Sequence, residues 1–304
     1  MAINETVALP RSVPGMQVRG TLPRSIAACT KFARKNPLSG AAAVFLIFIT
    51  VVALAAPLIA PYNPLDIAPA DRLQAPSWAH PMGTDNLGRD MLSRIIYGGR
   101  ISLAVGFWSV VLGTCTGAVI GIVSGYYGGV VDIVIQRIVD AMQSFPGLLM
   151  ALALVSVLGA STMNVIIAIS LVVAPLDSRV IRSATLQVRG MDYIAAARSV
   201  GVSDSRIMFR HVLPNVAAPF IIIAAVTFGG AILIEASLSF LGLGTPPPAP
   251  SWGGMLNGAG RQYLEKMPTL ALFPGLAISF TVLALNLLGD GLRETLDPRL
   301  KGRD

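Results

Sequence analysis

The residues that are able to do chemistry in this chain do not form a catalytic site. The pentapeptide Gly113-Thr114-Cys115-Thr116-Gly117 imitates the Gly-X-nucleophile-X-Gly turn of hydrolases. That turn joins a strand to a helix, whereas this pentapeptide lies inside a long apolar stretch. None of the four lysines follows a glycine, so the Gly-Lys pair of a phosphate-binding loop is absent. We expect no catalytic residue, and any ATP that the protein uses must be bound by another chain.

One carboxyl group, that of Glu235, falls inside an apolar stretch. Glu235 follows Pro214 by 21 residues, or about 31 Å of helix at 1.5 Å per residue. This distance places it near the far end of a membrane-spanning helix. Ionisable groups inside spans are costly and often functional, so Glu235 is a candidate residue of a translocation path. The alternative is a structural role, in which it reaches the membrane interface or caps a neighbouring helix.

The composition of the chain indicates the class of protein to which it belongs. Of 304 residues, 54% are hydrophobic and only 13% are charged, about half of the roughly 25% that a soluble domain carries. This hydrophobicity excludes a disordered chain, and two cysteines are too few for a disulfide scaffold. The net charge of +7 does not indicate nucleic-acid binding, because nucleic-acid binders carry basic residues on a charged soluble surface. We expect a polytopic membrane protein.

Six apolar stretches have about the length of a helix that crosses a bilayer. They are 41–59, 101–125, 141–160, 161–176, 216–234 and 267–289. They are continuously apolar rather than alternating, which indicates helices and not a barrel. The expected fold is therefore all-α, with an N-terminal segment (1–40), a first span (41–60), an extracytoplasmic segment (61–100), a five-helix core (101–290) and a tail (291–304).

The basic residues predict the orientation of these spans. Segments 1–40, 126–140, 177–215 and 290–304 hold 17 of the 23 Lys and Arg residues. By the positive-inside rule these segments are cytoplasmic, and so are both termini. The stretch 24–35 mixes basic and apolar residues, which suits either a helix on the inner membrane surface or a solvated tail.

The same topology argues against a metal site. His80 falls in an outer segment and His211 in an inner one, so the two imidazoles are separated by the membrane. Neither is expected to share a metal ion with Cys29 or Cys115.

A glycine recurs at every fourth position of the second stretch, as Gly113, Gly117, Gly121 and Gly125. At 3.6 residues per turn these glycines form one stripe along a helix. A stripe of small residues lets another helix approach closely. We expect packing within the chain, and a sliding or dimer surface is the alternative.

The segment 177–215 carries signals for two short helices. Asp192 is a good N-cap, the residues after it favour a helix, and Gly201 is typical of the residue that ends one. Ser203 begins a second short helix, which Pro214 ends. Two short helices joined at a glycine predict a knob that inserts into the groove of a partner, with Tyr193 and Ile194 exposed.

This segment resembles a loop of ABC importer permeases. Ala195-Ala196-Ala197, Gly201 and Leu213-Pro214 match the family pattern E-A-A-x3-G-x9-I-x-L-P. In that family the loop carries the coupling helix, which docks onto the ATP-binding subunit. The resemblance gives this role to Asp192, Tyr193, Ile194, Ala195, Ala196, Ala197, Arg198, Gly201, Leu213 and Pro214.

Two positions depart from the family pattern. Ala195 stands where the family has Glu, and His211 stands where it has Ile. Without the Glu, half of a capping box with Asp192 is lost, which costs about 1 kcal/mol or less. An ion pair from that Glu to the ATPase is lost as well.

Three further motifs resemble the dipeptide, oligopeptide and nickel permeases. They are Met82-Gly83-Thr84-Asp85-Asn86-Leu87-Gly88-Arg89-Asp90, Leu238-Ser239-Phe240-Leu241-Gly242-Leu243-Gly244 and Asn286-Leu287-Leu288-Gly289-Asp290-Gly291-Leu292-Arg293. The motifs occur in family order over about residues 30–300. The extra first span indicates the C-type member of a pair of permeases.

The resemblance implies the fold of a type I ABC importer permease and a set of partners. These are a sister permease, two cytoplasmic ATP-binding subunits that hold ATP and Mg, and an extracytoplasmic solute-binding protein, in a bacterial cytoplasmic membrane. The solute is a di- or oligopeptide or a related small molecule, moved by alternating access. The outer loop 245–268 either docks the binding protein or forms a simple ordered lid. A secondary transporter is the alternative, although no internal repeat supports it.

Overall fold

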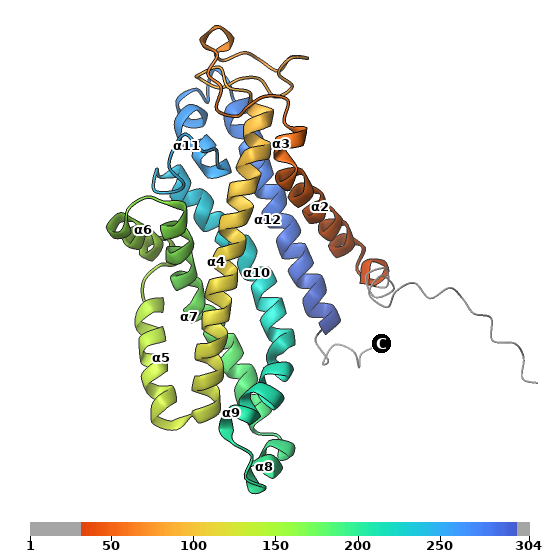
Figure 1. Ribbon diagram of the computed structural model, residues 1–304, viewed down its shortest axis with the longest axis vertical. Helices are drawn as coiled ribbons and strands as arrows, with labels where there is room; N and C mark the ends of the chain where they lie inside the picture. The colour runs from red at the N-terminus through yellow and green to blue at the C-terminus, as the bar shows by residue number, and fades with distance from the viewer. Residues whose placement is uncertain (1–31, 297–304) are drawn as a thin grey trace, which may run out of the picture.

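The structure, a computed structural model, describes residues 32–296. Within that range the regular elements are helices, apart from one isolated bridge between Thr84 and Asp90. Figure 1 shows an elongated bundle with α8 (Asp192–Ser199) at one end and α11 (Trp252–Gln262) at the other. We refer to these as the α8 end and the α11 end. The all-α fold class is confirmed.

Five helices of the described range are long and apolar enough to cross a membrane. They are α2 (Pro37–Leu54), α4 (Met91–Tyr127), α7 (Thr162–Arg189), α10 (Leu213–Phe240) and α12 (Thr269–Leu296). The pair α5 (Gly129–Gln143) and α6 (Gly147–Leu158) supplies a sixth crossing if the two are counted as one span. The six predicted spans correspond to these elements, with different bounds.

The third span is not the single helix predicted over 141–160. α6 turns away from α5 by 86°, and Pro146 lies in the break between them. Proline has no N–H to continue the helical hydrogen bonds, and it disfavours a helical residue before it. The apolar run therefore consists of the end of one helix and the whole of another.

Charged residues lie inside α5 because α7 pairs with them. Asp132 forms an ion pair with Arg182, and Asp140 forms one with Arg179. The sequence rule that ends a span at a charge therefore placed the start of this helix too late, since α5 begins at Gly129.

The fourth span is longer than the predicted 161–176. α7 continues to Arg189 and includes Pro175 and Asp177, so Asp177 is a residue of the helix and not the first residue of a loop. Its side chain is fully buried and accepts hydrogen bonds from two threonines. Those bonds are the physical reason that a carboxylate is tolerated there.

The remaining spans also begin or end away from their predicted limits. α4 begins at Met91 rather than at 101, because the Asp90 side chain caps it by accepting from the Ser93 N–H at 2.8 Å. α2 ends at Leu54 and is followed by the short α3 (Ala56–Ile59), and α12 continues to Leu296. Of the predicted surface helix over 24–35, only residues 32–35 are described, and they are helical.

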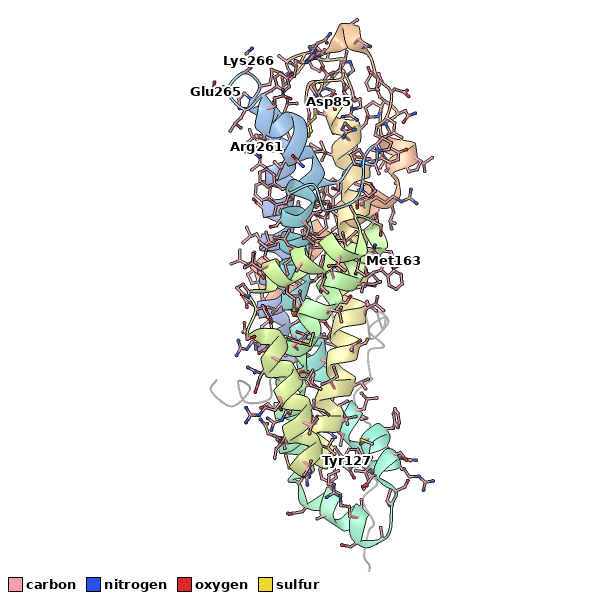
Figure 2. The ribbon with its side chains drawn as sticks, turned by 90° about the vertical axis from the view of Figure 1, so that its left-hand side faces the viewer. Asp85, Tyr127, Met163, Arg261, Glu265 and Lys266 are labelled. Atoms are coloured by element: carbon pink, nitrogen blue, oxygen red, sulfur yellow. The ribbon has the colours of Figure 1, made fainter. Side chains whose placement is uncertain are left out.

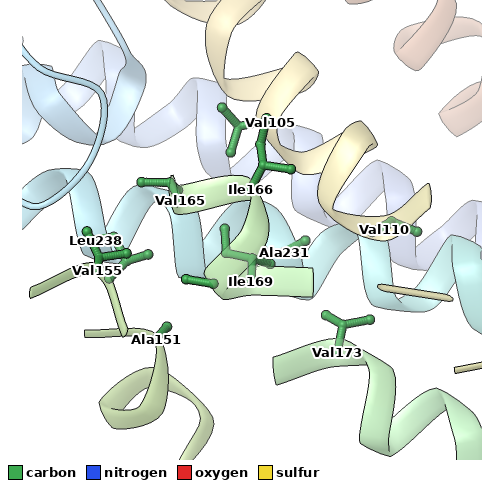
Figure 3. Close-up of a cluster of buried hydrophobic side chains, with 11 residues drawn as sticks. Val105, Val110, Ala151, Val155, Val165, Ile166, Ile169, Val173, Ala231 and Leu238 are labelled. Atoms are coloured by element: carbon green, nitrogen blue, oxygen red, sulfur yellow. The ribbon is translucent and has the colours of Figure 1, made fainter. Parts of the chain in front are cut away.

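One buried apolar cluster joins α4, α6, α7 and α10. Val105, Val155, Ile169 and Leu238 are among its fully buried members, and Figure 3 shows side chains of these four helices meeting in it. Because α6 contributes Ala151 and Val155 to the cluster, the bend after α5 is held by packing.

The segment between α3 and α4 covers the α11 end, with one short helix, η1 (Pro69–Asp71). α11 is fastened to α4 through Trp252, which is 1% exposed. Its indole N–H donates to the Ile95 carbonyl at 2.9 Å, and a side chain at Gly98 or Gly99 would collide with its ring. These contacts fix α11 against α4.

Candidate functional site

The loop between α7 and α10 projects from the α8 end of the bundle (Figure 1). It consists of α8, a turn at Gly201, the short helix α9 (Asp204–Ile207) and the π-helical turn η2 (Met208–Val212). We call residues 190–212 the α8 loop. Figure 2 shows Tyr127, the last residue of α4, beside this loop, whereas Asp85 and Arg261 lie at the opposite end.

A glycine ends α8, as the sequence predicts. Gly201 has φ +78°, a left-handed conformation that favours glycine. Its N–H donates to the Arg198 carbonyl at 3.0 Å, and the Val202 N–H donates to the Ala197 carbonyl at 3.1 Å. These two bonds form a Schellman motif, which closes the end of the helix.

Buried apolar side chains fasten the α8 loop to the bundle. Ile194, Ile207 and Val212 are fully buried in one cluster with Ile181 of α7 and Tyr126 of α4. The loop therefore shares a hydrophobic core with the ends of two long helices.

A polar contact adds to this attachment. The Tyr126 hydroxyl donates to Asp204 Oδ1 at 2.6 Å, and the Arg198 guanidinium lies 4.9 Å from the centre of the Tyr126 ring. One aromatic side chain at the end of α4 thus contacts both α8 and α9, and a cation over a ring face stabilises the contact.

Three details of this loop differ from the sequence-based expectations. Ile194 is fully buried rather than exposed, because it fills the space between α8 and the helix ends. Asp192 is the first residue of α8, whose N-cap is Met191, so a Glu at position 195 would not complete a capping box with Asp192. Pro214 does not end a helix, because it lies in the first turn of α10, where proline is tolerated.

The outer face of the α8 loop is exposed and carries apolar side chains among charged ones such as Arg198 and Arg206. Tyr193, Ala195 and Ala196 on α8 are exposed, and so are Val200, at 79%, and Phe209, at 71%. An exposed apolar patch on a rigid base is typical of a protein–protein contact. The small side chains of α8 allow a partner to approach the helix closely.

The glycine stripe lies against α7. Side chains added at Gly113, Gly117, Gly121 and Gly125 would come within 2.5–3.0 Å of the carbonyl oxygens of α7 residues 170, 174, 178 and 182. Equal steps of four along both helices show that α4 and α7 are parallel and pack backbone to backbone. The stripe is therefore used within the chain, and it is not available as a dimer surface.

Glu235 lies in α10 towards the α11 end and is 1% exposed. Its Oε1 accepts from the Ser239 hydroxyl at 2.7 Å, and the side chains of Ser102 and Ser251 lie beside the same carboxyl group. A carboxyl group surrounded by hydroxyls of α4, α10 and the start of α11 is placed to hold these elements together.

Asp177 is a functional candidate that the sequence analysis missed. Its Oδ2 accepts from Thr114 of α4 at 2.6 Å, and its Oδ1 accepts from Thr227 of α10 at 3.0 Å. One signal was available in the sequence: no helix-ending residue occurs between Asp177 and Gly190, so the apolar helix had reason to continue through the charge.

The α11 end carries a charged cluster beside a cavity. Asp85 accepts from the Arg89 side chain at 2.7 Å and lies 3.5 Å from Arg94. A cavity of about 300 Å³ is lined by these three residues, by the loop around Gly244 and by Asn257 of α11. The surface at this end is therefore hollowed, with charged side chains in the wall of the hollow.

The two histidines lie at opposite ends of the bundle. His80 bonds Asp90 at 3.0 Å beside the start of α4, and His211 belongs to η2 at the α8 end. In the part of the chain that the structure describes, no three His, Cys, Asp or Glu side chains gather as metal ligands would.

Comparison with known families shows where this architecture belongs. The family described as "Binding-protein-dependent transport system inner membrane component" matches residues 117–302, which is more than half of the chain. A second family, described as "N-terminal TM domain of oligopeptide transport permease C", matches residues 32–76. This chain belongs to the family of binding-protein-dependent transport system inner membrane components.

Curated relatives extend over nearly the whole permease. It is 43% identical to the dipeptide transport system permease protein of Alkalihalophilus pseudofirmus over 268 residues, or 88% of each chain. It is 44% identical to the glutathione transport system permease protein of Pectobacterium atrosepticum, over 89% of this chain and 90% of that one. The corresponding Escherichia coli O157:H7 protein is 45% identical, over 88% and 89% of the two chains.

The fold of the permease also matches solved structures. An inward-facing methionine ABC transporter structure matches with a TM-score of 0.55 and 18% sequence identity, over 68% of this chain and 98% of that chain. At this identity the likeness concerns the fold. The protein is thus a multi-pass permease subunit of an ABC importer.

Proposed function

We propose that this protein is the C-type permease of an ATP-driven importer for di- or oligopeptides or a related small solute, located in a bacterial cytoplasmic membrane. Two relatives over nearly the full length are named for dipeptides and for glutathione, which is itself a peptide. The N-terminal family match over residues 32–76 supports the C-type assignment.

The observation that carries this proposal is the α8 loop, an exposed knob with apolar side chains on its outer face and a buried base. Ile194 and Val212 fasten it to helix ends, while Ala195, Ala196 and Phe209 face outward. We assign this face to docking on a cytoplasmic ATP-binding subunit. We assign the binding of ATP and Mg, and with it the hydrolysis of ATP, to two such subunits rather than to this chain.

The orientation follows from the docking assignment and the charge distribution. The α8 end faces the cytoplasm together with both termini, in agreement with the excess of basic residues in the segments assigned to that side. The hollowed α11 end faces outward. There a solute-binding protein delivers the solute, and residues 245–268 form part of its docking surface.

Transport then consists of a movement that passes from the α8 loop to the bundle. Closure of the two ATP-binding subunits displaces the α8 loop, and the adjoining ends of α7 and α10 move with it. A sister permease supplies the other wall of the path, so the two chains rock between inward-open and outward-open states. Nucleotide hydrolysis resets the pair.

A pair of matched substitutions tests the docking assignment. Ala196→Arg places a long charged side chain on the exposed face of α8, and Ala70→Arg makes the same change at an exposed position of the opposite end. We expect the affinity-purified complex to lose its ATP-binding subunits with Ala196→Arg and to keep them with Ala70→Arg, while both variants insert normally. Equal retention of the ATP-binding subunits by both variants would contradict the assignment.

A further inference from the structure

Asp177 occupies a position that the proposed transport cycle has not yet explained. It lies on α7, 12 residues before the helix ends at the α8 loop, or about 18 Å along the axis. Its carboxylate bonds α4 through Thr114 and α10 through Thr227. We propose that Asp177 is the positioning residue through which displacement of the α8 loop reaches α10, an inference that rests on the proposed function.

The path from the α8 loop to Asp177 is rigid. Between Asp177 and the loop, α7 packs backbone to backbone on α4, where a side chain at Gly121 or Gly125 would come within 2.5 or 2.9 Å of a carbonyl oxygen. Asp177 itself touches this contact, since a Cβ on Gly117 would lie 3.1 Å from its Cβ. The loop, α4 and α7 therefore move as one body, which we call the α4–α7 arm.

The mechanical connection from the α8 loop along α10 to Thr227 is weaker than the connection along α7 to Asp177. Thr227 lies 14 residues beyond the start of α10, and two interruptions come before it. The first is the π-helical turn η2, a geometry in which the helical hydrogen bonds are out of register. The second is Pro219, which removes one hydrogen bond from α10. A push that travels along α10 itself is therefore weakened by bending before it reaches Thr227, although Val216 of this stretch packs with Ile181 of α7.

The bond between Asp177 and Thr227 bypasses this weak stretch. It joins the α4–α7 arm to α10 at a point farther from the α8 loop than both η2 and Pro219. Because Asp177 is fully buried, a broken bond would leave a carboxylate oxygen without a donor in an apolar environment, which is unfavourable. The bond is therefore kept as the arm moves, and α10 has to follow.

Two isosteric substitutions separate this role from a general contribution to stability. Thr227→Val removes the hydroxyl that bonds α10 to the arm, and Thr114→Val removes the hydroxyl within the arm, where the glycine contacts remain. Each variant loses one hydroxyl and one hydrogen bond to the same carboxylate. The readout is the ratio of ATP hydrolysed to solute transported, measured with the complete complex in proteoliposomes, because this ratio does not depend on how much complex assembles.

We expect Thr227→Val to raise this ratio by about twofold or more, as substitutions along coupled elements do, and Thr114→Val to leave it unchanged. Asp177→Asn, which can bond both threonines, should also keep the wild-type ratio. An unchanged ratio in Thr227→Val, an equal rise in both threonine variants, or a rise in Asp177→Asn would each overturn the proposal. Uptake by the wild-type complex tests the proposed function on its own. If the wild-type complex showed no ATP-driven uptake, the proposed function would be refuted whatever the variants did.

Discussion

At the residue scale, Glu235 is surrounded by groups that hold it in place. Ser239 donates to one of its oxygens, and its side chain does not line the cavity at the α11 end. We therefore expect Glu235→Gln, which keeps this hydrogen bond, to transport solute at close to the wild-type rate. Glu235→Ala leaves a cavity and an unpaired hydroxyl, and it should destabilise the protein by about 2 kcal/mol or more.

Uptake by the reconstituted complex and thermal denaturation of the purified complex measure these two effects. If Glu235→Gln abolished uptake while the complex assembled and melted normally, Glu235 would belong to the translocation path after all.

The two buried carboxylates show how far single residues can be predicted. Glu235 is conspicuous in the sequence because apolar residues flank it on both sides, whereas Asp177 stands at the edge of an apolar run, where a charge predicts the start of a loop. Its partners, Thr114 and Thr227, are far from it in sequence, so the contacts that stabilise it inside a helix exist only in the folded bundle.

At the element scale, the contact between α4 and α7 depends on the missing side chains of the glycine stripe. A Cβ on Gly121 would lie 2.5 Å from the Ser178 carbonyl oxygen and 2.9 Å from the Arg182 nitrogen, and neither backbone atom is able to move aside alone. We expect Gly121→Ala to cost about 1–3 kcal/mol, as overpacking of a close contact does, and to lower the melting temperature of the complex.

Gly230→Ala is the matched control for this prediction, because a Cβ at exposed Gly230 of α10 meets no atom within 4 Å. It should melt at or above the wild-type temperature, since alanine favours a helix over glycine. Equal melting temperatures for the Gly121 and Gly230 variants would contradict the close packing of α4 and α7.

The helices themselves were largely predictable, and their ends were not. Apolar length indicated six spans, and Gly201 and Ser203 marked the turn within the α8 loop. The errors lie where tertiary contacts decide: ion pairs to α7 allow α5 to carry Asp132 and Asp140, and Ile194 is buried by the ends of α4 and α7. Counts of apolar residues along one helix contain no information about such partners.

At the scale of the whole molecule, the basic residues still predict one orientation after the helix bounds are corrected. Five of the 17 basic residues on the side assigned to the cytoplasm belong to α5, α7 or α12, and 12 remain without them; the five are Arg137, Arg179, Arg182, Arg189 and Arg293. Of the six on the side assigned to the exterior, Arg94 and Arg100 belong to α4, and four remain. The imbalance therefore remains in the segments to which the positive-inside rule applies.

Cysteine labelling checks this orientation. In a chain whose Cys29 and Cys115 are replaced by serine, Ser199→Cys should react with a membrane-impermeant thiol reagent only in inside-out vesicles. Ser77→Cys, at the α11 end, should react only in intact spheroplasts. Both serines are exposed. Labelling of Ser199→Cys in intact spheroplasts and of Ser77→Cys in inside-out vesicles would show the opposite topology.

The central claim is that the α8 loop connects this permease to ATP hydrolysis. The measurement that tests it most directly is uptake of labelled di- and oligopeptides into proteoliposomes that contain the complete complex and its solute-binding protein, with the α8 end and the nucleotide on the same side. We expect uptake with ATP, none with a non-hydrolysable ATP analogue, and none with Ala196→Arg. Uptake driven by a proton gradient without ATP would instead identify a secondary transporter and contradict the claim.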